Sequence, residues 1–247
     1  MSKQTEVKIL PVGDCALLVE FGREVNEKLN DRVRALCDAV LAAGYPWLED
    51  VVPAYASLLV SWEAGATDFT AASAAVEHLL AVLSERSSEQ KRIWAIPVCY
   101  EGEFAPDMAD MEQLCGLSAA EIIRLHSGRD YKIYMLGFLP GFAYLGGLDK
   151  KIHAPRLQTP RVRIEAGSVG IGGAQTGIYP LASPGGWRLI GKTPLPLYDP
   201  DRAEPIFYQA GDFVRFLPIS AKAFDHLAAD VAAGRWQPQL CDGEVAR

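Results

Sequence analysis

The chain has 247 residues, of which 49% are hydrophobic and 22% are charged, a composition typical of a soluble globular protein. This length can bury the core of one large domain or of two small ones. The formal net charge of −7 argues against a surface for nucleic acid or for anionic membranes, because both need an excess of basic residues.

The sequence carries no sign of membrane insertion, secretion or metal binding. No apolar run approaches the roughly 20 residues needed to cross a bilayer, and the first ten residues lack the apolar centre of a signal peptide. The five cysteines include no Cys-x-x-Cys pair, and the four histidines show no ligand spacing. We therefore expect a cytoplasmic protein without a disulfide framework or a metal of its own.

In chain order, residues 1–90 are expected to form a small α/β sandwich domain. Strand-like apolar runs alternate with two amphipathic helical patterns, which begin at the candidate caps Asn26 and Asp68. The strand-like runs are 7–12, 16–21 and 57–62. Elements in this order predict a sheet that carries both helices on one face.

The polar segment 84–92 marks the expected boundary with a second domain, residues 91–247. The elements expected to flank its centre are a strand at 93–99, helices from Asp107 and from Ser118, a strand at 213–217 and a last helix capped by Ser220. Ser118 and Glu121 have the spacing of a capping box, which supports the second of these helices.

The centre of the second domain, from Ile133 to Tyr198, holds more than half of the chain's glycines and nearly half of its prolines. A packed helix does not tolerate this density, because Gly loses backbone entropy and Pro removes a hydrogen-bond donor. We therefore expect strands, bulges and tight loops. Two interpretations stay open here: a surface built to hold a ligand, or a β-barrel whose tight corners need glycine.

Two letter patterns in this stretch resemble nucleotide-binding loops and are rejected. Residues 186–193 match a P-loop, but their middle residues are strand-forming, and Pro194 and Pro196 follow where a helix should begin. Residues 167–173 lack the strand and helix that a dinucleotide fingerprint needs. No signature of a serine or cysteine nucleophile is present, so we expect no complete hydrolytic machinery in this chain.

Several long motifs of the same stretch resemble one family. They are Gly137-Phe-Leu-Pro-Gly-Phe-Ala-Tyr-Leu145, Pro155-Arg156, Pro160-Arg161, Ala166-Gly-Ser-Val-Gly170, Gln175-Thr-Gly-Ile-Tyr-Pro180 and Ser183-Pro-Gly-Gly-Trp187. Over nearly its whole length the chain is similar to the PxpB/KipI family, whose members are also called the 5-oxoprolinase B subunit, allophanate hydrolase subunit 1 or kinase inhibitor KipI. Glu165 stands where we expect the family to have proline, which concerns only the shape of one turn.

The resemblance implies a fold and an activity. The fold is α+β, with a small amino-terminal α/β sandwich followed by a cyclophilin-like β-barrel domain and a carboxy-terminal helix. The activity is that of one subunit of an ATP-dependent 5-oxoprolinase, which opens the lactam of 5-oxo-L-proline, a small-molecule amide, to L-glutamate. The implied partners are a PxpC-like subunit and a PxpA-like subunit, and ATP is used by the complex and not by a P-loop in this chain.

Three other functions are weighed against this one. A KipI-like inhibitor of a sensor histidine kinase and a subunit of an allophanate or urea carboxyltransferase-like complex are the main alternatives. A prolyl isomerase is ranked last, because the sequence has no Phe-His-Arg-like catalytic run.

Site residues can be proposed from the chemistry of lactam opening. Guanidinium groups suit both a carboxylate and a phosphorylated intermediate, and amide, hydroxyl and phenol groups suit a polar amide. The expected catalytic residues are Arg161, Gln175 and Tyr179, and the expected substrate-binding residues are Arg156, Arg163, Thr176 and Ser183. The alternative for Gln175 and Tyr179 is that they tie barrel loops together.

A partner interface is also expected in the glycine-rich stretch. Large apolar residues beside flexible corners are typical anchors of protein interfaces. The residues chosen on this ground are Phe138, Phe142, Tyr144 and Trp187. The isolated chain is expected to be inactive without its partner.

Overall fold

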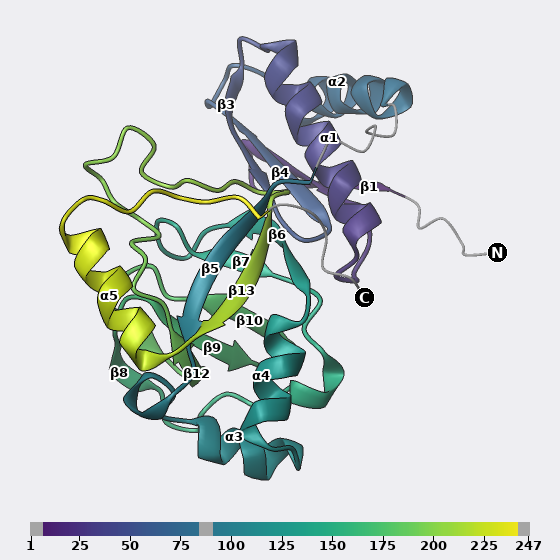
Figure 1. Cartoon of the computed structure of the whole chain (residues 1–247). Coiled ribbons are helices and arrows are strands. Elements are labelled where there is room, and N and C mark those ends of the chain that lie inside the picture. Colours follow the sequence, from purple (N-terminus) through teal and green to yellow (C-terminus); the bar gives the residue numbers. More distant parts are fainter. Residues whose placement is uncertain (1–6, 84–90, 242–247) are drawn as a thin grey trace. The chain divides into compact units, whose positions relative to one another are not determined.

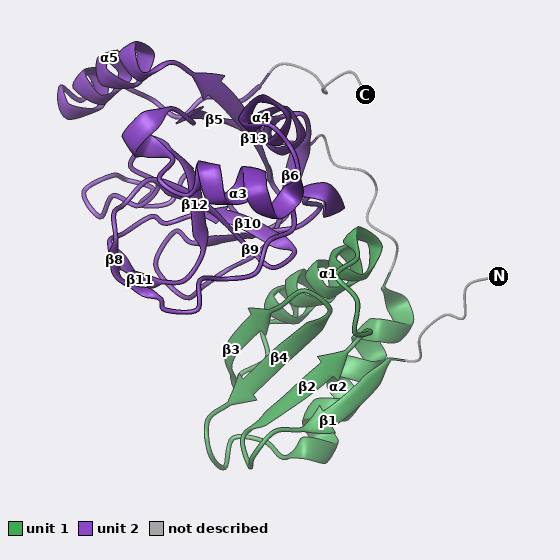
Figure 2. Ribbon diagram, turned by 90° about the horizontal axis from the view of Figure 1, so that it is seen from below, with its two compact units in different colours: residues 1–90 green, residues 91–247 purple. Residues whose placement is uncertain are grey.

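The structure is a computed structural model that describes residues 7–83 and 91–241 and divides into two compact units. Unit 1 is Met1–Gln90 and unit 2 is Lys91–Arg247 (Figure 2). Most of the expected boundary segment 84–92, and the first six residues of the segment considered as a signal peptide, lie outside the described residues. Within the described ranges, no helix has the length and apolarity that a membrane crossing requires.

Unit 1 is a four-stranded antiparallel sheet with two helices on one of its faces (Figure 2). The strand order is β1–β2–β4–β3. The strands are β1 (Lys8–Pro11), β2 (Ala16–Glu20), β3 (Leu48–Pro53) and β4 (Ser57–Trp62), and the helices are α1 (Glu27–Ala43) and α2 (Phe69–Val82). The predicted α/β sandwich is confirmed.

Both helices of unit 1 begin at the caps expected from the sequence. The Asn26 side chain accepts hydrogen bonds from two backbone N–H groups of the first turn of α1, and Asp68 accepts one from the Ala71 N–H. Gly44 ends α1 with a φ of 60°, a left-handed conformation that glycine adopts without strain. Local capping chemistry therefore sets both helix starts.

The sequence predicted three strands for this unit and did not predict the fourth, β3, so that prediction was incomplete. β3 lies at the edge of the sheet, and a register shift between Leu48 and Asp50 interrupts its pairing with β4. Val51 is buried, whereas Val52 is 47% exposed. An edge strand with a bulge lacks the regular alternation by which a half-buried strand is recognised in a sequence.

Unit 2 is built on a closed barrel of seven strands in the order β10–β7–β6–β13–β5–β12–β9 (Figure 1). The barrel strands are β5 (Ile93–Cys99), β6 (Asp130–Leu136), β7 (Ala143–Leu145), β9 (Ser168–Gly172), β10 (Gln175–Ile178), β12 (Arg188–Lys192) and β13 (Phe213–Ile219). A separate two-stranded sheet pairs β8 (Arg161–Ile164) with β11 (Ser183–Gly185). The α+β class and the β-barrel are thereby confirmed.

Three helices accompany the barrel. They are α3 (Met108–Cys115), α4 (Ala119–Ser127) and α5 (Ala221–Ala232), with short 3-10 turns at η1 (Gly102–Phe104) and η2 (Lys150–Ile152). The expected capping box is present, because Ser118 and Glu121 each accept a hydrogen bond from the other's backbone N–H. Residues 186–193, with their P-loop letters, contain β12, which is a barrel strand and not a phosphate loop.

The barrel interior is a closed apolar core. Its fully buried side chains include Ile96, Tyr131, Ile133, Val169, Ile171 and Phe216. β5 and β13, the first and the last barrel strands in the chain, pair in parallel from Ile93 opposite Phe213 to Cys99 opposite Ile219. The helix α5 packs against β5 (Figure 1).

A buried polar network links α4 to the barrel through His126, whose side chain is wholly inaccessible. Its Nδ1 lies 2.8 Å from the Tyr100 hydroxyl, and its Nε2 lies 2.8 Å from the Thr176 Oγ1. The Thr176 hydroxyl donates to the Gly170 carbonyl oxygen at 3.0 Å, so it accepts from a proton on Nε2, and Nδ1 accepts from Tyr100. Burial, with a smaller contribution from the Arg129 charge, lowers the pKa of His126 to about 3.

The buried neutral state of His126 predicts a pH dependence of stability. The unfolded chain binds a proton at the imidazole below a pH of about 6.5, whereas the folded chain does not until about pH 3. The stabilisation that comes from the neutral imidazole is therefore fully present above the unfolded-state pKa of about 6.5. Below it, the free energy of unfolding falls as the pH drops, with a slope approaching about 1.4 kcal/mol per pH unit. Denaturant unfolding of unit 2 between pH 7 and pH 5 measures this slope.

A pair of variants separates the proton from the network. His126→Gln should flatten the slope, because it removes the group that titrates. Tyr100→Phe should lower stability by about 1 kcal/mol at every pH but keep the slope, because the imidazole stays buried. An NMR signal of the His126 ring that titrates near pH 6.5 in the folded protein would contradict this account.

Candidate functional site

Outside the barrel core, unit 2 contains a second buried group of side chains, here called the aromatic cluster. It consists of Phe142, Ile164, Tyr179, Trp187 and Leu189. Phe142 lies directly before β7, Ile164 ends β8, and Tyr179 directly follows β10. Trp187 lies directly before β12, and Leu189 lies within it. The cluster therefore ties the separate β8–β11 sheet to the barrel wall.

The indole of Trp187 lies directly against glycine backbone in β9 and β10. A Cβ atom built on Gly170 would meet the Trp187 side chain at 3.1 Å, on Gly172 at 2.4 Å and on Gly177 at 3.1 Å. None of these glycines has a positive φ, so it is close approach and not conformational freedom that requires them. These three glycines thus serve the packing of one tryptophan.

Tyr179 is locked inside the aromatic cluster, where 3% of its surface is exposed. Its ring makes edge contacts with Phe142 and Trp187, at centroid distances of 5.9 and 6.1 Å. Burial raises the pKa of Tyr179, and a hydrogen bond with the Trp187 backbone and the charges of Arg156 and Arg161 partly offset that rise. This geometry favours the alternative in which Tyr179 holds loops together.

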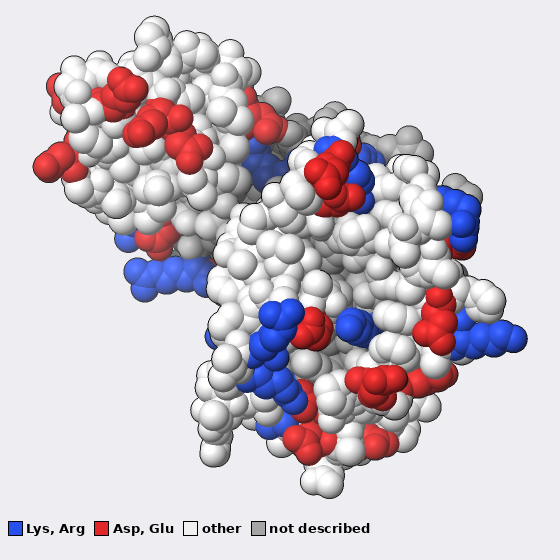
Figure 3. Space-filling model, turned by 90° about the vertical axis from the view of Figure 1, so that its left-hand side faces the viewer, with Lys and Arg blue, Asp and Glu red and all other residues white. Residues whose placement is uncertain are grey.

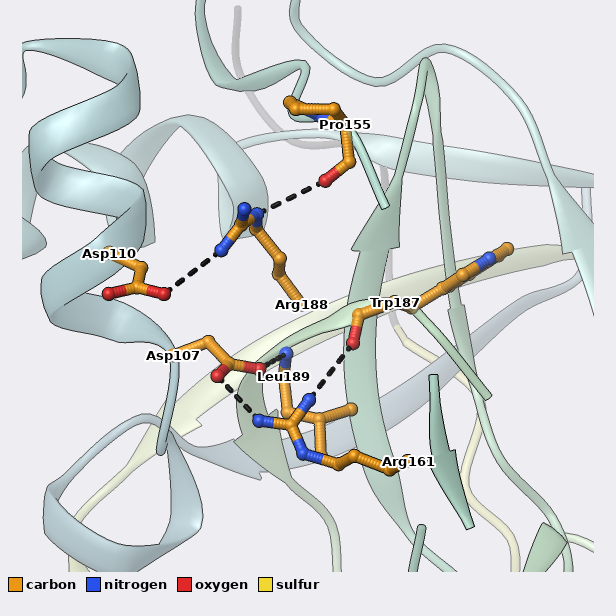
Figure 4. A network of polar contacts seen from close by, with 7 residues as sticks. All are labelled: Asp107, Asp110, Pro155, Arg161, Trp187, Arg188 and Leu189. Atoms are coloured by element: carbon orange, nitrogen blue, oxygen red, sulfur yellow. Dashed lines mark hydrogen bonds and ion pairs between the residues drawn. The ribbon is translucent and has the colours of Figure 1, made fainter. Parts of the chain in front are cut away.

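Arg161, at the start of β8, is held by two elements distant in the sequence (Figure 4). Its Nη2 donates to Asp107 Oδ1 at 2.6 Å, and its Nη1 donates to the Trp187 carbonyl oxygen at 3.5 Å. The other Asp107 oxygen, Oδ2, accepts from the Leu189 N–H at 2.6 Å. One buried carboxylate therefore connects α3, β8 and β12.

A second arginine is held beside the first one. Arg188 donates through Nη1 to Asp110 Oδ2 at 3.0 Å and through Nε to the Pro155 carbonyl oxygen at 3.1 Å (Figure 4). Its side chain is 13% exposed, while that of Asp110 is 59% exposed. Two carboxylates at the start of α3 thus orient two guanidinium groups, which are groups suited to binding a carboxylate or a phosphate.

The other expected substrate-binding residues are more scattered. Arg163 is exposed and pairs with its neighbour Glu165 at 2.7 Å. Arg156 is exposed beside Gly186, and its charge reaches Tyr179. Ser183 is 8% exposed, and its Oγ has no hydrogen-bond partner among the described residues. Arg156 and Arg161 therefore both lie near Tyr179, whereas the Arg163 side chain is engaged by Glu165.

Two of the expected polar contacts belong to the barrel. The Thr176 hydroxyl is fully buried between His126 and Gly170, which leaves no room for a substrate and assigns it a structural role. Gln175 begins β10 and is half-buried.

The turn that precedes β9 forms with Glu165 at the position where proline was expected, since the Ser168 N–H donates to the Glu165 carbonyl oxygen at 3.2 Å. A proline is therefore not needed to form that turn.

The expected partner interface is corrected by burial. Phe142 is 3% exposed and Trp187 is 6% exposed, so both are core residues of the aromatic cluster and cannot anchor a partner. Tyr144 is half-buried against the same cluster. Phe138, by contrast, is 65% exposed and has a φ of 63°, rare for a residue with a side chain. Large apolar residues look alike in a sequence, and only packing separates them.

Sequence patterns missed Asp107 and Asp110 as members of the site. Asp107 contacts a residue 54 positions away and Asp110 one 78 positions away, and no local pattern encodes such pairings. The only available signal was an Asp-x-x-Asp spacing at the start of a helix, which ordinary helix capping also explains. From the sequence, only the basic residues of this site were predictable.

Charged side chains are unevenly distributed over the face shown in Figure 3. Acidic side chains gather on one part of this face, and elsewhere on it basic and acidic side chains are intermixed. Among the described residues, no group of three or more His, Cys, Asp or Glu side chains is arranged to hold a metal ion. Arg161 and Arg188, each oriented by an aspartate and a carbonyl oxygen, have the chemistry to bind an anionic ligand.

Comparison with known proteins identifies the family to which this chain belongs. Residues 7–208 match the family model for the carboxyltransferase domain, subdomain C and D. The chain is 42% identical over 227 residues to the 5-oxoprolinase B subunit of Bacillus subtilis, and the match covers 88% of this chain and 95% of that protein.

Two solved structures share the fold. The crystal structure of TTHA0988 has a TM-score of 0.74 and 37% identity, and the match covers 84% of this chain and 40% of that one. The urea carboxylase of Kluyveromyces lactis has a TM-score of 0.77 at 18% identity, over 96% of this chain and 24% of that one, which shows the fold alone. The chain therefore belongs to the carboxyltransferase subdomain C and D family and, within it, to the PxpB family of 5-oxoprolinase B subunits.

Proposed function

We propose that this chain is the B subunit of an ATP-dependent 5-oxoprolinase, which converts 5-oxo-L-proline to L-glutamate. The observation that carries the proposal is the 42% identity to the Bacillus subtilis 5-oxoprolinase B subunit across 95% of that protein's length. The partners proposed are a PxpC-like subunit and a PxpA-like subunit, since a B subunit acts with others.

The chemistry of the reaction gives the oriented arginines a role. An unstrained lactam opens only when its carbonyl is made electrophilic, for example by phosphorylation of the amide oxygen. The substrate then carries a carboxylate and an anionic phosphoryl group, both of which guanidinium groups bind through paired hydrogen bonds. We assign the carboxylate to Arg161, with Arg156 and Arg188 as neighbouring cationic groups.

The ATP is assigned to the partner subunits. The one P-loop letter pattern of this chain contains β12, whose backbone pairs with β9 and β5, so its amides cannot cradle a phosphate. The residues present do not fit a nucleotide site of that type. The part of this chain in the reaction is then to bind and orient the lactam.

The first prediction from the proposed function concerns how the reaction is divided among the subunits. The chain alone should show no 5-oxoproline-dependent ATP hydrolysis, and activity should appear when the cognate PxpC-like and PxpA-like subunits are added. A coupled assay of ADP release with each subunit alone and in combination measures this. Appreciable turnover by the isolated chain, or no turnover by the full set, would refute the proposal.

The second prediction concerns Arg161. Lysine keeps the charge but cannot reproduce the planar fork, so Arg161→Lys should lower kcat/KM for 5-oxoproline by about 10- to 100-fold. The matched control is Arg129→Lys: Arg129 also contacts one carboxylate, Asp149 at 2.7 Å, and one carbonyl oxygen, and its exposure is 35% against 31% for Arg161. Equal kcat/KM values in the two variants would remove Arg161 from the site.

We also propose that Phe138 is the anchor of the partner interface. The Leu139 N–H donates to the Gly137 carbonyl oxygen at 2.7 Å, so Phe138 is the centre of a tight three-residue turn with a positive φ. The segment that follows the turn is also fixed, because the Tyr208 hydroxyl donates to the Gly141 carbonyl oxygen. A strained backbone that displays an exposed aromatic ring is a feature that binding sites retain.

The third prediction separates Phe138 from its buried neighbour. Phe138→Ser should weaken the affinity for the PxpC-like partner by at least about tenfold with little loss of stability, because the ring is an exposed anchor. Phe142→Ser should instead destabilise unit 2 by about 3–5 kcal/mol, because it opens a cavity in the aromatic cluster. Calorimetry and co-purification on both variants test this, and normal complex formation by Phe138→Ser would place the interface elsewhere.

A further inference from the structure

Asp107 occupies the N-cap position of α3 but does not cap it. In the described part of the chain, the N-cap side chains of the other four α-helices, Asn26, Asp68, Ser118 and Ser220, each accept a hydrogen bond from their own first turn. Aspartate is one of the best capping residues, so a cap that turns away from its helix gives up a local gain. A local rule broken in this way is a mark of a functional position.

The carboxylate of Asp107 instead accepts hydrogen bonds from residues of two strands, β12 and β8. Its Oδ2 accepts from the Leu189 N–H at 2.6 Å, and the Asp107 backbone N–H donates to the Leu189 carbonyl oxygen at 3.0 Å. These two bonds fix the aspartate against β12. The remaining oxygen, Oδ1, accepts from Arg161 Nη2 at 2.6 Å (Figure 4).

Arg161 is thereby fixed from two sides. Asp107 holds Nη2, and the Trp187 carbonyl oxygen accepts from Nη1 at 3.5 Å. A guanidinium group has five N–H donors in one plane, so these two contacts set the orientation of the plane and leave donors for a ligand. The side chain is 31% exposed, whereas that of Asp107 is 8% exposed.

We infer that Asp107 is a positioning residue, which holds the Arg161 guanidinium in the orientation that binds the carboxylate of the lactam substrate. The inference rests on the proposed function and deepens it. Holding the fork before the substrate arrives removes the loss of side-chain freedom that binding would otherwise cost. Asp107 itself does not touch the substrate.

Simple electrostatics predicts the opposite effect, which makes the test decisive. A carboxylate beside Arg161 repels an anionic ligand, so neutralising it should strengthen anion binding if charge alone mattered. If orientation matters more, neutralising it should weaken binding. The sign of the change in KM therefore distinguishes the two accounts.

The experiment compares Asp107→Asn with the wild type in the reconstituted complex, with 5-oxoproline as the varied substrate. The expected result is a KM raised by about tenfold with kcat nearly unchanged, because the substrate carboxylate is bound equally before and during the reaction. The double variant Asp107→Asn, Arg161→Lys should be no worse than Arg161→Lys, since both changes remove one interaction. A KM that falls or stays the same in Asp107→Asn overturns the inference.

Asp149→Asn is the matched control. Asp149 also accepts from an arginine, Arg129, and from one backbone N–H, that of Lys151 at 2.9 Å. It lies outside the network of Figure 4, so its loss should leave the KM unchanged. An equal rise in KM in Asp149→Asn would show that any lost ion pair has this effect, and would overturn the inference.

A second measurement does not depend on the reaction. The NMR order parameter of the Arg161 Nε–H bond, assigned by the signal missing in Arg161→Lys, should be high in the isolated wild type and low in Asp107→Asn. An unchanged order parameter would overturn the positioning role even if the complex is active. A lower order parameter in Asp107→Asn, together with a wild-type complex that has no 5-oxoproline-dependent activity, would instead reject the proposed function. The role of Asp107 in orienting Arg161 would then stand.

Discussion

The packing of one indole ring on bare backbone is the constraint on which the rest of the site depends. Gly172 and Gly177 leave the space that the Trp187 ring fills, Gly170 leaves space for the Trp187 Cβ atom, and a Cβ atom on Gly172 would start 2.4 Å from the indole nitrogen. Interiors are close-packed, so this ring can be moved only at a cost in buried apolar contact. The backbone at residue 187 is therefore fixed, and with it the carbonyl oxygen that faces Arg161 and the start of β12.

Upon that fixed backbone, the first turn of α3 arranges the charges. The Asp107–Arg161 pair is partly buried, with side-chain exposures of 8% and 31%. Removing either side chain would leave the other charge partly buried without its partner, which would lower the stability of the fold. The Arg188–Asp110 pair joins the same helix to the first residue of β12, and its carboxylate is largely exposed to water. Both pairs orient a guanidinium group, but the ion pair with the exposed Asp110 is more strongly screened by water and contributes less to stability.

The same arrangement explains why this chain is suited to act within a complex. It offers oriented cationic groups, a rigid aromatic cluster and an exposed aromatic ring on a strained turn. In the described residues, by contrast, no side-chain group is arranged to hold a metal, and the P-loop letters contain a strand. In the proposed reaction, such a site would bind and orient the lactam.

The sequence by itself determined the local features of this protein. Helix starts such as Asn26 and Ser118 were predictable because a cap and its partners lie within one turn, and the family was evident from long motifs. Tertiary structure alone decided that Phe142 is core and Phe138 is surface, that the bulged edge strand β3 completes a sheet, and that Asp107 serves Arg161 and not its own helix. The physical reason is distance along the chain: partners 54 or 82 residues apart leave no periodic trace, and burial is a property of packing that a residue's type does not state.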